Sequence, residues 1–260
     1  MKKLFALLTI CLFFACSGGG SAEKSKKATL VIKELPYIPC DEAYIDIPGA
    51  NFSANCVDGF SKVPNFELIN HNGDTITNQS LEGENYILHF FFASCPTVCP
   101  NNTKNIYNYI YAKDHQGNEQ FSEKPKILSI SIDNDSPEVL RNYMTQDQFR
   151  IDINSNWYFL TGDPNYVRQF ASNMSQLVVN NFTSEDKEHF GYAHSEYVLL
   201  VDKEGFFRKN INGEIWSAQT EKEMDILRGD IKALIKIQNI EKYKTIKISK
   251  ENSDTIIDIK

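Results

Sequence analysis

The chain has 260 residues, of which 42% are hydrophobic, 12% are aromatic and 23% are charged. That share of apolar residues is enough to fill a core, and the length fits one large domain or two small ones. The formal net charge is −7. We therefore expect no nucleic-acid partner, because proteins that bind nucleic acids normally present a basic surface.

Residues 1–15 have the features of a secretory leader. Two lysines give a positive start, and the apolar segment LFALLTICLFFA is too short to span a bilayer comfortably. The sequence FFAC followed by SGGGS resembles a bacterial lipoprotein signal, with Ala15 directly before Cys16. The resemblance implies cleavage before Cys16, a lipid on its thiol, and an exported protein that faces the periplasm, anchored to a membrane through a flexible linker. The alternative is ordinary cleavage to a soluble exported protein.

Residues 16–61 predict a linker and an N-terminal extension, since the hydrophobic pattern there is poorly periodic. Cys40 and Cys56 lie in the extension and enclose 15 residues. In an oxidising compartment an unpaired thiol needs a reason, so we expect a Cys40–Cys56 disulfide worth about 3 kcal/mol. A second metal site is the alternative for these two cysteines.

Residues 62–240 alternate between strand and helix patterns and predict one domain. Capping residues before a proline mark two helix starts, at Ser136 and Asp163, and Thr220 with Glu223 forms a capping box. The expected elements are a hairpin over 63–81, strands over 85–94, 124–133 and 157–162, a hairpin over 195–211, and helices over 95–113, 136–149, 163–172 and 220–238.

This order of elements predicts an α/β fold in which helices flank both faces of a mixed sheet. The segment 85–94 is a continuous apolar run, which is typical of a central strand buried on both faces. Residues 241–260 form a C-terminal tail. Their pattern fits either two strands around a polar turn or a frayed end.

The motif FFFASCPTVCP, residues 90–100, places Cys95 and Cys99 four positions apart, directly after the predicted central strand. Residues four apart on a helix share a face, so the two sulfurs can meet there. A helix start also favours thiolate over thiol, and two thiolates are a soft donor set that prefers Cu(I), zinc or iron–sulfur. Four functions compete for this pair: a structural disulfide, a dithiol redox couple, a peroxide-reducing thiol, and a soft-metal site.

A metal site needs a third ligand, and the chain has five histidines. His71, His89 and His115 are read as core or surface imidazoles. His189 and His194 flank FGYA before the strand pattern SEYVLLVD. His194 is the candidate ligand because a strand can hold it rigidly, although spacing alone does not decide the matter.

FFFASCPTVCP resembles the CPxxCP signature of the Sco/SenC family, and HSEYVLLVDKEGFFR is similar to that family's second motif. The likeness covers residues 62–238 and implies a thioredoxin-like fold. It also implies one copper ion held by Cys95, Cys99 and His194, as Cu(I), with Cu(II) left open. The implied role is to deliver copper to, or to reduce the thiols of, the binuclear copper centre of cytochrome c oxidase, with another periplasmic copper protein as the alternative partner.

One stretch departs from the family pattern, which has a sequence like DPxRDTP after the third strand. This chain has DNDSP, residues 133–137, without the arginine. Asp133 matches the first position and is a candidate for the neighbourhood of the metal. The alternative is that Asp135 or Ser136 simply caps the next helix.

The main functional alternative is a thiol-disulfide oxidoreductase that cycles Cys95 and Cys99, so enzymatic activity is an open expectation. The usual redox motif has two residues between its cysteines, whereas this motif has three. A peroxidase would normally have a threonine three residues before the attacking cysteine, and position 92 is Phe. A structural zinc site would need His89 or His189 as a fourth ligand.

Overall fold

Eight strands form one mixed sheet in the computed structural model, which describes residues 34–40, 55–112, 121–175 and 196–248. The chain divides into Met1–Val31, which lies outside these ranges, and a unit spanning Ile32–Lys260. The strand order is β10 (Trp216–Ser217), β8 (Tyr197–Val201), β5 (Tyr86–Phe91), β6 (Lys126–Ser131), β7 (Trp157–Thr161), β3 (Glu67–Asn70) and β4 (Thr75–Thr77), with β9 (Phe207–Arg208) paired to β8.

The centre of the sheet is parallel, and its flanks are antiparallel. Strands β5, β6 and β7 run in parallel, whereas β8 pairs antiparallel to β5 and β3 pairs antiparallel to β7. All six residues of β5 are buried. The continuous apolar run therefore predicted the central strand correctly, because a parallel strand covered on both faces needs apolar side chains at every position.

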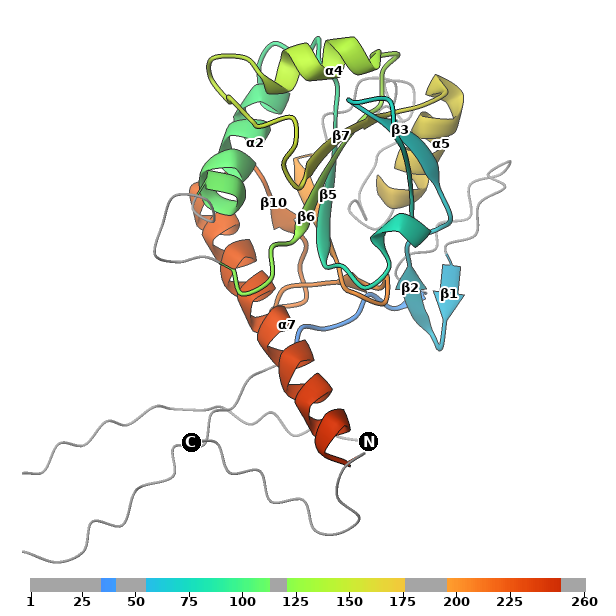
Figure 1. Cartoon of the computed structure of the whole chain (residues 1–260), viewed down its shortest axis with the longest axis vertical. Helices are drawn as coiled ribbons and strands as arrows, with labels where there is room; N and C mark the ends of the chain where they lie inside the picture. The colour runs from blue at the N-terminus through green and yellow to red at the C-terminus, as the bar shows by residue number, and fades with distance from the viewer. Residues whose placement is uncertain (1–33, 41–54, 113–120, 176–195, 249–260) are drawn as a thin grey trace, which may run out of the picture. The chain divides into compact units, whose positions relative to one another are not determined.

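Helices cover both faces of the sheet, as expected for the predicted α/β fold. Helix α2 (Val98–Ile106) continues as a π-helical segment, η2 (Tyr107–Ala112), and is followed by α4 (Pro137–Met144), α5 (Pro164–Ser175) and α7 (Glu221–Ile248). Figure 1 shows α2 and α7 on one side of the sheet and α5 on the other. Neighbouring residues of β5 pack against different helices. The ring centroids of Phe91 and Tyr143 of α4 lie 5.1 Å apart, and those of Phe90 and Phe170 of α5 lie 6.3 Å apart.

The predicted helix starts are confirmed by their capping contacts. The Ser136 hydroxyl accepts a hydrogen bond from the backbone N–H of Val139 over 3.3 Å. Asp163 accepts from Tyr166 N–H over 3.0 Å, and Thr220 accepts from Glu223 N–H over 3.2 Å. Each cap satisfies a backbone donor that the first helical turn leaves without a partner.

Part of the N-terminal extension packs against the domain. Strands β1 (Asn55–Val57) and β2 (Phe60–Lys62) form a separate antiparallel pair, so a strand crosses the domain boundary expected at residue 62. Leu35 and Ile38 are each only 1% exposed and belong to the core. The buried Arg208 of β9 fixes this segment by donating to the Leu35 carbonyl over 2.8 Å.

The C-terminal helix is longer than the sequence predicted. Helix α7 runs to Ile248, so the expectation that residues 241–260 form a hairpin or a frayed tail is wrong for the first eight of these residues. No proline or glycine interrupts the segment from 241 to 248, and its lysines and glutamate are good helix formers. Residues 249–260 lie outside the described part of the chain.

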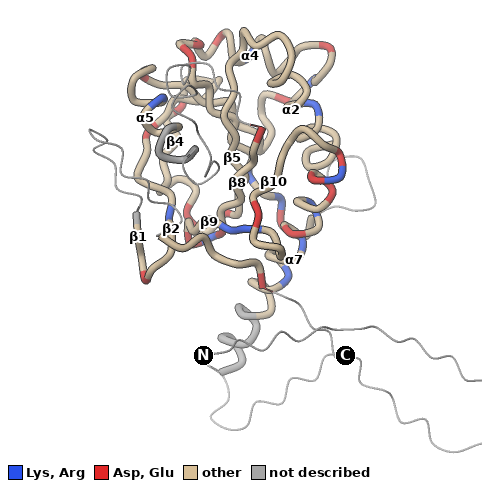
Figure 2. Tube along the Cα trace, turned by 180° about the vertical axis from the view of Figure 1, so that it is seen from behind, with Lys and Arg blue, Asp and Glu red and all other residues tan. Residues whose placement is uncertain are grey.

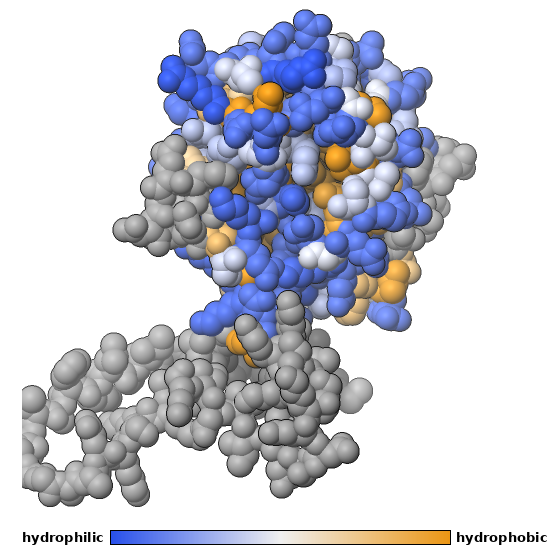
Figure 3. All heavy atoms as spheres, in the orientation of Figure 1, coloured by the Kyte–Doolittle hydropathy of each residue, from blue (hydrophilic) through white to orange (hydrophobic). Residues whose placement is uncertain are grey.

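The surface carries charges of both signs. Figure 2 shows acidic and basic residues interspersed along α7. In Figure 3 the visible face is mostly hydrophilic, and hydrophobic side chains gather near β1 and β2, where Val57 is 38% and Phe60 39% exposed. Among the described helices, none is both long enough and apolar enough to cross a membrane.

Candidate metal centre

Cys95 and Cys99 lie in the segment that connects the carboxyl end of β5 to α2. The expected helix start at Cys95 is wrong: α2 begins at Val98, and Cys95 lies in a turn before it. Pro96 has no N–H to donate and restricts the backbone of Cys95 away from the helical region, which explains the later start. Cys99 occupies the first turn of the helix, so the two thiols come from two kinds of local structure.

The sulfur of Cys95 nevertheless forms a hydrogen bond with the first turn of α2. The backbone N–H of Cys99 donates to the Cys95 Sγ atom over 3.4 Å. Thr97, the N-cap residue, makes no capping hydrogen bond with its own side chain. The Cys95 sulfur therefore takes one of the first-turn N–H groups that a serine or aspartate cap would otherwise satisfy.

The surroundings of the two thiols shift their pKa values in opposite directions. Burial would raise the pKa of Cys95, but the backbone N–H groups of Cys99, Thr97 and Val98, with help from the Cys99 thiol, lower it below its ordinary value. Burial raises the pKa of Cys99 to about 12, and the neighbouring Cys95 adds to the rise. Both side chains are free thiols and are 4% and 3% exposed. Cys95 is thus the first to become a thiolate.

The ends of three parallel strands converge beside the cysteine turn. The Asp135 carboxylate accepts from the backbone N–H of Ala93 over 2.9 Å and from the Ser131 hydroxyl at the end of β6 over 2.6 Å. The Asp135 carbonyl accepts from the Thr161 hydroxyl at the end of β7 over 2.7 Å. Asp135 thus does more than precede a helix, whereas Ser136 has the capping role that was the alternative expectation.

Tyr143 of α4 covers this region from the helical side. Its hydroxyl forms a 3.1 Å hydrogen bond with the Thr103 hydroxyl of α2. The pKa of Tyr143 is raised by burial first, and then by the charges of Cys99, Cys95 and Asp135. The phenol is therefore neutral, and it lies near enough to both thiols and the carboxylate for their charges to act on it.

The 133–137 loop lacks the arginine of the family pattern, but Arg168 of α5 contacts the start of this loop. Arg168 of α5 approaches the Asp133 carboxylate at 3.9 Å, and its Nε donates to the Ile132 carbonyl over 3.3 Å. The Arg168 and Asp133 side chains are 49% and 38% exposed, so solvent screens the pair. Nothing in the sequence pattern pointed to Arg168, because it lies in a helix far along the chain.

Two histidines have structural roles in the core, as expected. His71 hydrogen-bonds the Ile153 carbonyl through Nε2 over 2.9 Å and accepts from Phe159 N–H over 3.3 Å. His89 is 2% exposed and forms a 2.6 Å hydrogen bond with the Ser129 hydroxyl, which also accepts from the Trp157 indole over 2.8 Å. Burial lowers the pKa of His89 to about 4, so the imidazole is neutral.

The expected third ligand, His194, lies outside the described residues, as do His115, His189 and Cys16. Within the described ranges, no three His, Cys, Asp or Glu residues are grouped so that they could hold a metal ion. Cys95 and Cys99 therefore provide two soft donors there. The His194 assignment stays a prediction.

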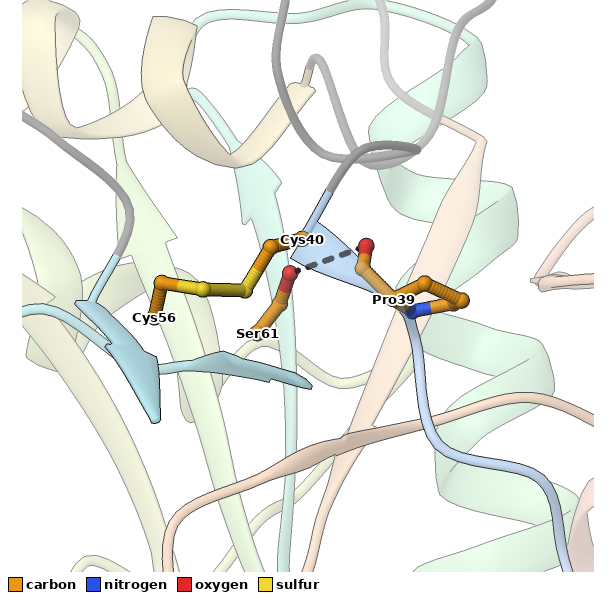
Figure 4. The surroundings of a disulfide bond; sticks show 4 residues. All are labelled: Pro39, Cys40, Cys56 and Ser61. Carbon is orange, nitrogen blue, oxygen red and sulfur yellow. Dashed lines mark hydrogen bonds between the residues drawn. A yellow bond between two sulfur atoms is a disulfide. The ribbon is translucent and has the colours of Figure 1, made fainter. Parts of the chain in front are cut away.

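Cys40 and Cys56 are joined by a disulfide, with an S–S distance of 2.03 Å and a Cα–Cα distance of 5.9 Å. Figure 4 shows that the bond links the N-terminal segment to β1, beside the hydrogen bond from the Ser61 hydroxyl to the Pro39 carbonyl, 3.3 Å long. Cys40 N–H also donates to the Gly59 carbonyl over 3.0 Å. The bond fixes the extension and leaves Cys95 and Cys99 as the free cysteines of the described chain.

The sheet, its flanking helices and the paired free thiols at a helix start define a thioredoxin-like protein with a CxxxC dithiol. The family model SCO1/SenC matches residues 58–227, which is more than half of the chain. The chain therefore belongs to the SCO1/SenC family.

Two relatives and one solved structure are similar to this chain. An SCO2-like protein of Rickettsia prowazekii is 26% identical over 145 residues, which cover 56% of this chain and 66% of that protein, just under two thirds. The SCO1 protein homolog of Bacillus subtilis is 28% identical over 155 residues, covering 58% of this chain and 74% of that protein. The structure of BsSco, described as a member of the Sco family of cytochrome c oxidase assembly proteins, has a TM-score of 0.52 and 23% identity over 66% of this chain and 92% of that chain.

Proposed function

We propose that this protein is a copper metallochaperone that holds one copper ion through Cys95, Cys99 and His194. The observation that carries the proposal is the close approach of the two cysteines: the backbone N–H of Cys99 donates to the Cys95 sulfur over 3.4 Å, and the two thiols also hydrogen-bond to each other. Two sulfurs held together in a buried site suit a soft ion such as Cu(I), and an imidazole nitrogen is a compatible third ligand.

The environment of the pair supports binding of a cation. Metal binding requires deprotonated cysteines, and the backbone N–H groups around Cys95 lower its pKa. Cys99, whose pKa is raised, would lose its proton when the metal arrives. Binding should therefore release protons and strengthen as the pH rises.

The client that fits the family is the copper-bearing subunit of cytochrome c oxidase, or another periplasmic copper protein. Membership of SCO1/SenC supports this proposal, and the related BsSco structure carries the description of an oxidase assembly protein. A three-ligand site leaves copper coordinatively unsaturated. Its copper can then pass to a client's thiolates by ligand exchange.

A lipid anchor on Cys16 would keep the chaperone at the membrane in which its client lies. The support is the leader and the FFACSGGG sequence that follows it. The Gly/Ser tract would give the domain reach from the membrane surface.

A second function, thiol-disulfide exchange, is favoured by the unequal pKa values of the two thiols. The Cys95 thiolate would attack one sulfur of a client disulfide, form a mixed disulfide and release the client's first thiolate. Cys99 would then attack the Cys95 sulfur and release the second, so that two electrons pass to the client and the pair becomes a disulfide. The same dithiol form binds copper, so both functions can use one site.

The test is an anaerobic Cu(I) competition titration of the reduced protein and of Cys95→Ala and Cys99→Ala. One tight equivalent in the wild type, lost in each variant, is the expected result. The double variant Cys40→Ser/Cys56→Ser is the matched control and should keep the tight site. Absence of tight binding in the wild type, with both thiols reactive and able to cycle, would instead favour the oxidoreductase.

A further inference from the structure

We propose that Asp135 is the positioning residue of the dithiol, acting through the backbone N–H of Ala93. This inference rests on the proposed function of the Cys95–Cys99 pair and deepens it. It begins from a contact across 42 positions of sequence, in which Asp135 Oδ2 accepts from Ala93 N–H over 2.9 Å.

Ala93 lies in the short segment that connects the end of β5 to Cys95. The segment leaves the sheet after Phe91, and Cys95 N–H donates to the Phe92 carbonyl over 3.2 Å, so a tight turn brings the first thiol back toward the strand end. Ala93 lies inside that turn. The Asp135 contact therefore holds the turn from outside and fixes the direction in which it presents Cys95.

Asp135 is itself held on two further sides. The same carboxylate oxygen accepts from the Ser131 hydroxyl over 2.6 Å, and the Asp135 carbonyl accepts from the Thr161 hydroxyl over 2.7 Å. Ser131 ends β6 and Thr161 ends β7, so the acceptor for Ala93 is tied to two neighbouring strands. Through Asp135, the position of the cysteine turn is therefore fixed relative to strands β6 and β7 of the sheet.

A hydrogen bond to a charged acceptor is stronger than one between neutral groups, and a partly buried donor without a partner is costly. Loss of the acceptor should therefore loosen the turn. Two sulfurs that are held less well together should bind a metal more weakly and should also close into a disulfide less readily. Both effects have one cause, and the second can be measured without metal.

The metal-free test is the equilibrium of the Cys95–Cys99 pair with glutathione. In this reaction the dithiol and one molecule of oxidised glutathione give the protein disulfide and two molecules of glutathione. In Asp135→Ala we expect the equilibrium constant to fall about tenfold, which raises the reduction potential by about 30 mV. Cu(I) affinity, measured in parallel by competition, should fall by about tenfold to a hundredfold.

Three further variants separate positioning from general loss of structure. Asp135→Asn keeps an oxygen of the right shape for Ala93 and should stay within about threefold of the wild type in both measurements. Ser131→Ala and Thr161→Val each remove one of the two contacts that hold Asp135 but leave the other contact and the Ala93 acceptor, so each should also stay within about threefold. Asp135→Ser, whose side chain is too short to reach Ala93, should behave like Asp135→Ala and provides a second loss-of-acceptor variant.

The inference is overturned if Asp135→Ala and Asp135→Ser keep the wild-type glutathione equilibrium. It is also overturned if Asp135→Asn is as damaging as Asp135→Ala, since charge and not the acceptor would then matter. If the wild type binds no tight copper but the glutathione measurements follow the expected pattern, the chaperone function fails and the role of Asp135 stands.

Discussion

The backbone N–H of Cys99 donates a hydrogen bond to the sulfur of Cys95 over 3.4 Å, and no side chain of the N-cap residue competes for the start of α2. A cysteine sulfur thus takes the place of a helix cap. This arrangement stabilises negative charge on Cys95 and holds Cys99 directly beside it.

Cys95 should react with alkylating agents well before Cys99. Backbone N–H groups outweigh burial and lower the pKa of Cys95, whereas burial raises that of Cys99 to about 12. At neutral pH iodoacetamide should modify Cys95 faster by about tenfold or more, because the thiolate is the reacting form. Mass spectrometry of timed digests measures the two rates, and the unfolded protein, in which both thiols should react alike, is the control. Equal rates in the folded protein would rule out the capping role of the Cys95 sulfur.

Acid should destabilise the fold through His89. Its pKa is about 4 in the folded protein because burial disfavours the cation, while an unfolded histidine titrates near 6.5. The unfolded chain therefore binds the proton first, and stability that is complete above about pH 6.5 is lost as the pH falls toward 4. Between pH 7 and 4.5 this single group should cost about 2 kcal/mol of unfolding free energy.

His89→Gln isolates that contribution, because glutamine can still hydrogen-bond the Ser129 hydroxyl but does not titrate. Urea unfolding of wild type and variant at both pH values measures the difference. The variant should lose about 2 kcal/mol less than the wild type on acidification. An identical loss in the two proteins would show that other groups cause the acid sensitivity.

The buried ion pair between Arg208 and Asp202 should matter far more for stability than its exposed neighbour. The two side chains are 5% and 2% exposed and lie 2.7 Å apart, whereas Glu34, 3.5 Å from the same arginine, is 57% exposed. Arg208→Ala leaves a buried carboxylate without its partner and should cost about 3–5 kcal/mol. Glu34→Gln, the matched control, should cost at most about 1 kcal/mol. Chemical denaturation measures both, and a loss below 1 kcal/mol for Arg208→Ala would contradict this account of how residues 34–40 are fixed.

The Cys40–Cys56 disulfide should stabilise the folded protein. Its cysteines are 16 positions apart, a loop whose closure is worth about 3 kcal/mol by chain entropy. The double variant Cys40→Ser/Cys56→Ser should lose about that amount in urea unfolding. The wild type in reducing buffer should lose the same amount, and no change in either would mean that the contacts of Leu35, Ile38 and Arg208 already hold the extension.

Local patterns in the sequence predicted the elements that depend on near neighbours. The apolar run of β5 and the caps at Ser136 and Asp163 are such features, and each was correct. The start of α2 was misplaced because helical spacing alone cannot tell a cysteine in the first turn from one just before it.

The contacts that shape the site could not be predicted, because they join residues far apart in sequence. Ala93 and Asp135 are 42 positions apart, and Arg208 and Leu35 are 173 apart. A donor and an acceptor at such separations carry no periodic signal. Arg168 is similar, since only the packing of α5 brings it to Asp133.

The measurement that tests the central claim most directly is X-ray absorption spectroscopy at the copper edge of the Cu(I)-loaded protein. His194→Ala and the matched control His189→Ala are measured beside the wild type. The account predicts two sulfur ligands and one nitrogen ligand in the wild type and in His189→Ala, and loss of the nitrogen with both sulfurs retained in His194→Ala. An unchanged nitrogen signal in His194→Ala, or a spectrum without two sulfur ligands in the wild type, would contradict it.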